Sequence, residues 1–156
     1  MAAIIQMLFA LRLKLALVLG LGMASTLTMA EPVDQGADRP LTALASLRWQ
    51  HRLIVVDAQI PDAVSRLQAA QPAIEARDIL WFVRDQGQVQ TNSPGQLDAG
   101  LAEELVQRFF SRSDAAVFLI GKDGGLKASA QQLDLPALFA RIDAMPMRRR
   151  EMDAAK

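Results

Sequence analysis

The chain of 156 residues has no cysteine and a single histidine, His51. The missing thiols exclude thiol redox chemistry, thiolate catalysis, disulfide bonds and lipid attachment through an N-terminal cysteine. One histidine cannot build a histidine-rich metal site within one chain, and the scattered serines do not complete a Ser-His-Asp arrangement around it. We therefore predict no metal and no cofactor, and we interpret His51 as a solvated residue.

An excess of basic residues is also missing. Lys and Arg together number 17, and Asp and Glu also number 17. The first thirty residues contain two basic residues, Arg12 and Lys14, and no acidic ones, so the remainder has a net charge of about −2. A nucleic-acid-binding domain usually carries a clear basic surplus, and we predict no nucleic-acid partner.

The N-terminal thirty residues have the pattern of a signal peptide. Arg12 and Lys14 precede an uncharged apolar run at residues 15–24, and Thr28-Met29-Ala30 supplies a small-x-small cleavage site. Cleavage after Ala30 would give a periplasmic or secreted protein with no stable membrane insertion. The alternative is an uncleaved membrane anchor, for which the run after Lys14 is short.

After the predicted signal peptide at residues 1–30, we expect a flexible leader at 31–40, one domain at 41–152 and a short C-terminal tail at 153–156. The leader has little apolar surface to bury. The 126 residues left after cleavage are a comfortable size for a single domain.

The apolar pattern of the domain predicts alternating strands and helices. Continuous apolar runs at residues 53–56 and 79–83 are typical of strands buried on both faces. Asp-Gly in the segment 115–128 predicts a hairpin, and the polar stretch 84–95 is predicted to be a loop. Helices are expected from about Asp62 with a break at Pro72, from 97 to 110, and from 135 to about 145.

The resulting order is β-α-β-α-β-β-α. Two helical crossovers predict parallel pairing and the hairpin predicts antiparallel pairing, so we expect a four-stranded mixed α/β sheet with helices on both faces. The glycine-rich turn at residues 121–125 superficially resembles a phosphate-binding loop. Its glycines join two strands instead of opening a helix, which favours a plain hairpin turn.

Three stretches carry a family resemblance: Trp49 with the strand Arg52-Leu53-Ile54-Val55-Val56, the turn Gly121-Lys122-Asp123-Gly124-Gly125, and the ending Ile142-Asp143-Ala144-Met145-Pro146-Met147-Arg148-Arg149. Together they resemble a bacterial exported family of unknown function. That family is similar to the thioredoxin-like domain of the animal equarin and sushi-repeat secreted proteins. The resemblance spans roughly Leu41 to Met152, and its ending is the most specific part.

The resemblance implies a thioredoxin-like fold without implying an activity. Thioredoxin-like enzymes usually place a cysteine pair after the first strand and a cis-proline before the third. Here those positions hold Ala58-Gln59-Ile60-Pro61 and Ser111-Arg112-Ser113-Asp114. A redox role of the wider superfamily is therefore not carried over, and we predict a redox-inactive domain.

The candidate site lies in the basic ending. Arg148 and Arg149 follow Pro146, and they either pair with Asp143 or Glu151 at a helix end or bind an oxyanion bidentately. Our leading hypothesis is that Arg52, Asp143, Arg148 and Arg149 form or support a site for a protein partner or a small anionic ligand. Pro146 is expected to turn the chain so that the two arginines fold back towards Asp143.

Two other functions are kept as alternatives. One is a hydrolase or transferase that uses Asp57 and Asp123 as acid and base, which would require the two carboxylates to converge in a cleft. The other is a structural envelope protein. Asp57 ends a strand, where open α/β sheets bind ligands, although a turn or cap is the commoner role. We interpret Trp49 as a core or lid aromatic.

Overall fold

The computed structural model describes residues 41–112 and 114–156. The predicted signal peptide and leader lie outside these described residues, and their predictions stand untested. Within the described part, no helix has both the length and the apolar character needed to cross a membrane.

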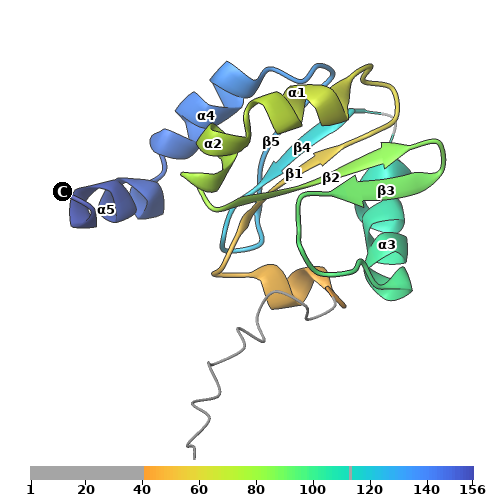
Figure 1. The fold of residues 1–156 in the computed structure, drawn as a ribbon, viewed down its shortest axis with the longest axis horizontal. Helices are drawn as coiled ribbons and strands as arrows, with labels where there is room; N and C mark the ends of the chain where they lie inside the picture. Colours follow the sequence, from red (N-terminus) through yellow and green to blue (C-terminus); the bar gives the residue numbers. More distant parts are fainter. Residues whose placement is uncertain (1–40, 113) are drawn as a thin grey trace, which may run out of the picture. The chain divides into compact units, whose positions relative to one another are not determined.

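A five-stranded mixed sheet forms the centre of the domain, in the order β3-β2-β1-β4-β5 (Figure 1). Its strands are β1 (Arg52–Val56), β2 (Ile79–Asp85), β3 (Gln88–Thr91), β4 (Val117–Ile120) and β5 (Leu126–Ala130). β1 pairs in parallel with β2, and every other neighbouring pair is antiparallel. The two apolar runs predicted as buried strands are β1 and β2, and the first strand of the predicted hairpin is β4. All three are buried along their apolar residues.

The predicted count of four strands is wrong, because part of the polar stretch 84–95 forms β3. This strand lies at the edge of the sheet and alternates exposed with partly buried residues, so it carries no apolar run. Gln86 and Gly87 both have positive φ, 46° and 82°, between β2 and β3. Positive φ at both central residues is the conformation that two-residue hairpin turns favour.

The extra hairpin also changes the direction of β4. We expected the second helical crossover to join parallel strands, yet β4 runs antiparallel to β1 and therefore to β2. β3 reverses the chain before the crossover begins. The crossover thus joins β3 to β4, which run in the same direction but are not neighbours.

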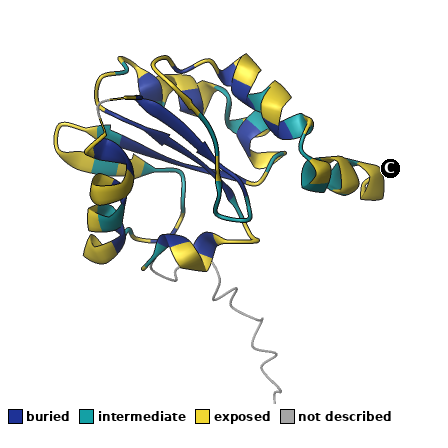
Figure 2. Ribbon diagram, turned by 180° about the vertical axis from the view of Figure 1, so that it is seen from behind, coloured by how far each residue is buried: buried dark blue, intermediate teal, exposed yellow. Residues whose placement is uncertain are grey.

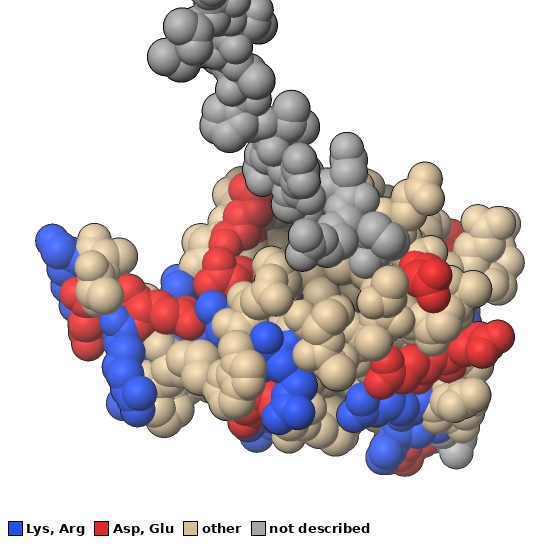
Figure 3. Space-filling view, turned by 90° about the horizontal axis from the view of Figure 1, so that it is seen from below, with Lys and Arg blue, Asp and Glu red and all other residues tan. Residues whose placement is uncertain are grey.

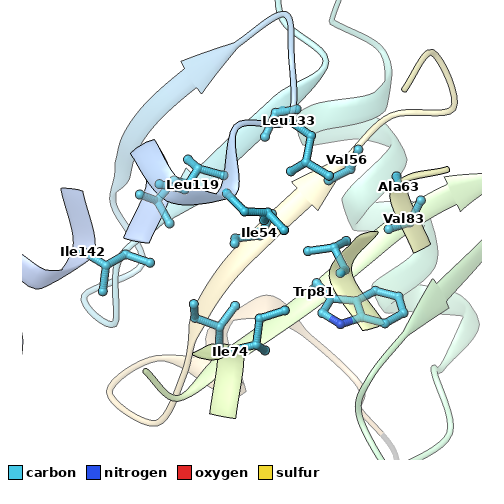
Figure 4. Close-up of a cluster of buried hydrophobic side chains, with 14 residues drawn as sticks. Ile54, Val56, Ala63, Ile74, Trp81, Val83, Leu119, Leu133 and Ile142 are labelled. Carbon is cyan, nitrogen blue, oxygen red and sulfur yellow. The ribbon is translucent and has the colours of Figure 1, made fainter. Parts of the chain in front are cut away.

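Helices cover both faces of the sheet, as predicted (Figures 1 and 2). One face packs against α1 (Ala63–Ala69), α2 (Gln71–Glu75) and α4 (Leu135–Asp143). Figure 4 shows this core, with Ile54, Trp81 and Leu119 of the sheet facing Ile74 and Ile142 of the helices. The other face packs against the 3-10 turn η1 (Leu44–Leu47), α3 (Ala99–Leu105) and the π-helical turn η2 (Val106–Phe110).

Two prolines act as helix boundaries. The helix expected from Asp62 breaks before Pro72, which occupies the first turn of α2. Pro146 begins α5 (Pro146–Ala154), a position where its missing N–H costs no hydrogen bond. The first half of the expected C-terminal tail, residues 153 and 154, is therefore helical, and Arg148 and Arg149 lie on α5. No residue of α5 is fully buried and only its two methionines, Met147 and Met152, are partly buried apolar residues, so apolar packing holds this helix less than it holds α4.

Candidate functional site

Arg52 begins β1 and is only 1% exposed. Its Nη1 donates to the carbonyl of Arg77 at 2.9 Å, and its Nη2 donates to both carboxylate oxygens of Glu151 at 3.1 and 3.0 Å. A buried guanidinium is tolerated when it is paired in this way. Arg52 therefore joins α5 to the central strand of the sheet.

Further ion pairs extend from Glu151. Lys122, in the turn between β4 and β5, lies 2.9 Å from the Glu151 carboxylate and 2.8 Å from that of Asp78. Arg148 reaches the same Glu151 at 3.6 Å and Asp143 at 3.4 Å. We call this set the ionic network, and its members are Arg52, Arg77, Lys122, Arg148, Asp78, Asp143 and Glu151.

Arg77 completes the network through Asp143. Its Nε and Nη2 donate to the two oxygens of that carboxylate at 3.0 and 2.6 Å. This bidentate geometry is the strongest form of an arginine–carboxylate pair. The guanidinium also lies 4.8 Å from the centre of the Phe139 ring. Phe139 is partly buried and packs against the core cluster below this contact.

The network lowers the pKa of two carboxyls. The hydrogen bond from Arg77 is the largest influence on Asp143, and it lowers the pKa of that group despite partial burial. Burial opposes ionisation of Glu151, but the combined hydrogen bonds and charges of Lys122 and Arg52 outweigh it and lower the Glu151 pKa. Both groups are therefore held ionised.

Beside the network lies a groove of about 420 Å³, within the range of small-ligand sites. We call it the basic groove; its lining residues are Arg52, Gly121, Lys122, Asp123, Lys127, Met145, Pro146, Met147 and Arg150. Four of these are cationic and one is acidic, while the two methionines and the proline form an apolar wall. Figure 3 shows basic and acidic side chains lying side by side at the end that carries α5.

The cations of the basic groove differ in how far they are already paired. Lys127 contacts Asp123 at 2.6 Å, and Arg52 and Lys122 are bound within the ionic network. Arg150 is exposed, and its side chain forms no ion pair within residues 41–112 and 114–156. An incoming anion would therefore meet Arg150 as its most accessible cation.

The structure brings together three of the four predicted site residues. Arg52, Asp143 and Arg148 belong to one network, whereas Arg149 is exposed and does not line the groove. Arg148 pairs with both Asp143 and Glu151, as the helix-end interpretation stated. We missed the contributions of Lys122, Lys127 and Arg150. The signal for the two lysines was the Gly-Lys-Asp-Gly-Gly turn, which nothing in the sequence places beside β1. Arg150 directly follows the two predicted arginines on α5.

The two aspartates of the enzyme alternative lie apart. Asp57 follows the last residue of β1, is 1% exposed, and accepts from Arg84 at 2.7 Å and from the backbone of Ala58 at 2.6 Å. Asp123 follows β4, whose end pairs with the start of β1. The carboxylates therefore occupy opposite ends of the sheet. The geometry does not favour acid–base catalysis by this pair.

Two residues of the segment before β1 differ from the expectation. Trp49 is not in the core, because it is 62% exposed, and its interpretation as a lid aromatic stays a prediction. His51 is partly buried rather than solvated, because the chain folds back onto the β4–β5 turn, and burial lowers its pKa against the opposing charge of Asp78. Its Nδ1 has no hydrogen-bond partner among the described residues. In the same part of the chain, no group of three or more metal-ligating side chains gathers.

Comparison with known protein families finds one that matches this chain. The family described as "Domain of unknown function (DUF4174)" matches residues 43–151. The chain belongs to this family. The matched span runs from η1 into α5, so it contains both the ionic network and the basic groove. No curated protein and no solved structure matches the chain.

Proposed function

We propose that this DUF4174 domain binds an anionic ligand in the basic groove. The observation that carries the proposal is the lining itself, with four cationic side chains and one carboxylate around an apolar wall. Such a recess suits a ligand that joins a negatively charged group to an apolar part. Methionine side chains adapt to irregular apolar surfaces, so Met145 and Met147 would pack against that part.

The residues would divide into direct contacts and supports. Arg150 would contact the anionic group, because its side chain forms no ion pair among the described residues. Lys127, which pairs only with Asp123 of the same hairpin among these residues, would be the second contact. Arg52, Arg148 and Asp143 would support the site by holding α5, which supplies one wall. Arg149 has no place in this arrangement, since it does not line the groove.

We also propose that the domain is thioredoxin-like, redox-inactive and exported. The parallel β1–α1–α2–β2 unit followed by the antiparallel β4–β5 hairpin and α4 supports the first assignment. The absence of cysteine supports the redox-inactive assignment, and the signal-peptide pattern before Glu31 supports export.

Two experiments test these last two assignments. Insulin reduction by dithiothreitol should proceed no faster with the protein than without it. Intact mass of the exported protein should show Glu31 as its first residue.

Methyl NMR tests the basic groove directly. Octanoate joins a carboxylate to an apolar chain, and its titration should shift the methyl signals of Met145 and Met147, which line the groove. Met152 on the same helix does not line it and serves as an internal control. Octanamide, which has the same chain without the charge, should bind at least about tenfold more weakly if the cations contribute a typical charged hydrogen bond.

Arg150→Ala should weaken octanoate binding by a similar factor. The matched control is Arg141→Ala, which removes an exposed arginine of α4 outside the groove and should leave binding unchanged. Equal affinity for octanoate and octanamide would show that the groove does not select an anion. An equal loss of octanoate affinity in Arg150→Ala and Arg141→Ala would show the same.

A further inference from the structure

Trp49 combines two unusual features. It is 62% exposed, and its backbone has φ = 67°. Left-handed backbone is disfavoured for bulky side chains and is usually occupied by glycine or asparagine. Such strain persists only where the surrounding structure imposes it, and it is concentrated at functional sites.

Two hydrogen bonds impose this conformation. The Trp49 N–H donates to the carbonyl of Lys122 at 2.6 Å, and Arg48 Nε donates to the carbonyl of Asp123 at 3.1 Å. Gly124, with φ = 79°, leaves room for Arg48, because a Cβ there would come within 2.9 Å of Arg48 Nε. We call residues 48–49 and 122–124 together the Trp49 ledge.

The Trp49 ledge is continuous with the basic groove. Lys122 and Asp123 belong to both, and the backbone N–H of Trp49 is hydrogen-bonded to Lys122 at one rim of the groove. Arg48 adds a further exposed cation on the same segment. The combined surface therefore presents an exposed aromatic residue, whose backbone is held by a hydrogen bond, next to a basic recess.

We propose that this combined surface binds an acidic segment of another polypeptide, with an apolar residue of that segment against Trp49 and carboxylates in the basic groove. This inference rests on the proposed function and names its partner. Tryptophan is among the residues most enriched in the energetic centres of protein interfaces, and rigid presentation lowers the entropy lost on binding. The surplus of cations in the groove complements an acidic chain.

A polypeptide fits the surface better than an anionic membrane does. The cations line a recess of about 420 Å³, which side chains can enter but a flat bilayer cannot. The described residues expose only three large hydrophobic side chains, and Trp49 is the only aromatic one among them. Stable membrane attachment needs a larger apolar area or several basic residues on a protruding face.

The test uses the cleaved protein and a short fluorescent peptide of glutamate and leucine, with binding followed by anisotropy. Trp49→Asn removes the indole but keeps a residue that tolerates left-handed backbone. We expect peptide affinity to fall at least about tenfold, as for an interface centre, while the melting temperature stays unchanged or rises. Arg141→Ala is the control, and a lysine–leucine peptide should not bind.

Unchanged peptide affinity in Trp49→Asn would overturn the inference. So would tighter, Trp49-dependent binding to phosphatidylglycerol vesicles than to the peptide, because the surface would then serve a membrane. The octanoate titration of Met145 and Met147 does not involve Trp49. The proposed function therefore stands or fails on that titration, whichever result the peptide gives.

Discussion

At the scale of single residues, two aspartates that each precede a helix differ in whether their side chains cap it. Asp62 and Asp134 each precede a helix, and both occupy the N-cap position. The Asp134 carboxylate accepts from the Ala137 N–H at 3.0 Å, as a capping residue should. Asp62 has φ = 55° and makes no capping hydrogen bond, so its side chain gives the helix no such support.

This difference predicts opposite results for two substitutions. Asp134→Ala should lower the free energy of unfolding by about 1 kcal/mol, because the Ala137 amide loses its partner. Asp62→Gly should change it by less than about 0.5 kcal/mol or raise it, because glycine adopts positive φ without strain. Urea unfolding of both variants measures the two values. A larger loss for Asp62→Gly would show that its carboxylate contributes a contact that the fold does not reveal.

Glu151 is the residue on which the ionic network depends most. It pairs with Arg52, Lys122 and Arg148, and Arg52 has almost no access to water. Removing its charge would leave the buried guanidinium with the Arg77 carbonyl and, at 3.9 Å, with the exposed Asp78 carboxylate as its only remaining partners among the described residues. The cost of an uncompensated buried charge exceeds that of an exposed pair.

Glu151→Gln should therefore destabilise the domain by about 2 kcal/mol, less than the loss of a fully buried partner because Glu151 is 25% exposed. The matched control on the same helix is Asp153→Asn. Asp153 pairs only with Lys156, and both side chains are largely exposed, so the change should cost less than about 0.5 kcal/mol. Equal unfolding free energies for the two variants would contradict the central role of Glu151.

At the scale of elements, α5 is unlike the other helices. It has nine residues and buries none of them, whereas α4, of equal length, buries Leu135, Leu138 and Ile142. A helix this short is marginal by itself in water. The ionic network is therefore the main contact that keeps α5 beside β1, and with it one wall of the basic groove.

This predicts a salt-sensitive helix. Raising the ionic strength to about 1 M shortens the screening length to roughly 3 Å and should weaken the partly exposed pairs of Glu151 and Arg148. Hydrogen exchange of the amides in α5 should then accelerate, while exchange in α4, held by apolar packing, should change little. The measurement is exchange mass spectrometry of the two segments at low and high salt. Equal acceleration in both would show that α5 does not depend on its ion pairs.

At the scale of the whole molecule, acidification should weaken the fold, and His51, Asp143 and Glu151 are the groups within or beside the ionic network that contribute. Their pKa values in the folded state lie below the ordinary values of 6.5 for His51, 3.8 for Asp143 and 4.5 for Glu151. A lowered pKa means that the folded state resists protonation. The stability it contributes is present above the unfolded pKa and is lost as the pH falls through the folded one.

The melting temperature should therefore fall in two steps. The first begins below about pH 6.5 as His51 takes up a proton, and the second below about pH 4.5 as Glu151 and Asp143 do. His51→Gln should remove the first step and keep the second. Thermal melts between pH 8 and about pH 3 measure both. A melting temperature that rises on acidification would contradict the direction of all three shifts.

The sequence by itself determined the parts of this protein that depend on local pattern. Apolar runs predicted β1, β2 and β4, prolines predicted the break at Pro72, and the Asp-Gly turn predicted the β4–β5 hairpin. These features follow from backbone sterics and from burial of neighbouring residues, which nearby sequence encodes. The missing cysteines likewise excluded thiol chemistry without any structure.

Only the tertiary structure decided the site. Arg52 and Glu151 are 99 residues apart in the chain, and Lys122 reaches both Asp78 and Glu151 because β4 runs antiparallel to β1. No periodicity encodes such a meeting, since it depends on strand order and on where α5 docks. The edge strand β3 was missed for a related reason, because a strand with one neighbour and a solvated face needs no apolar run.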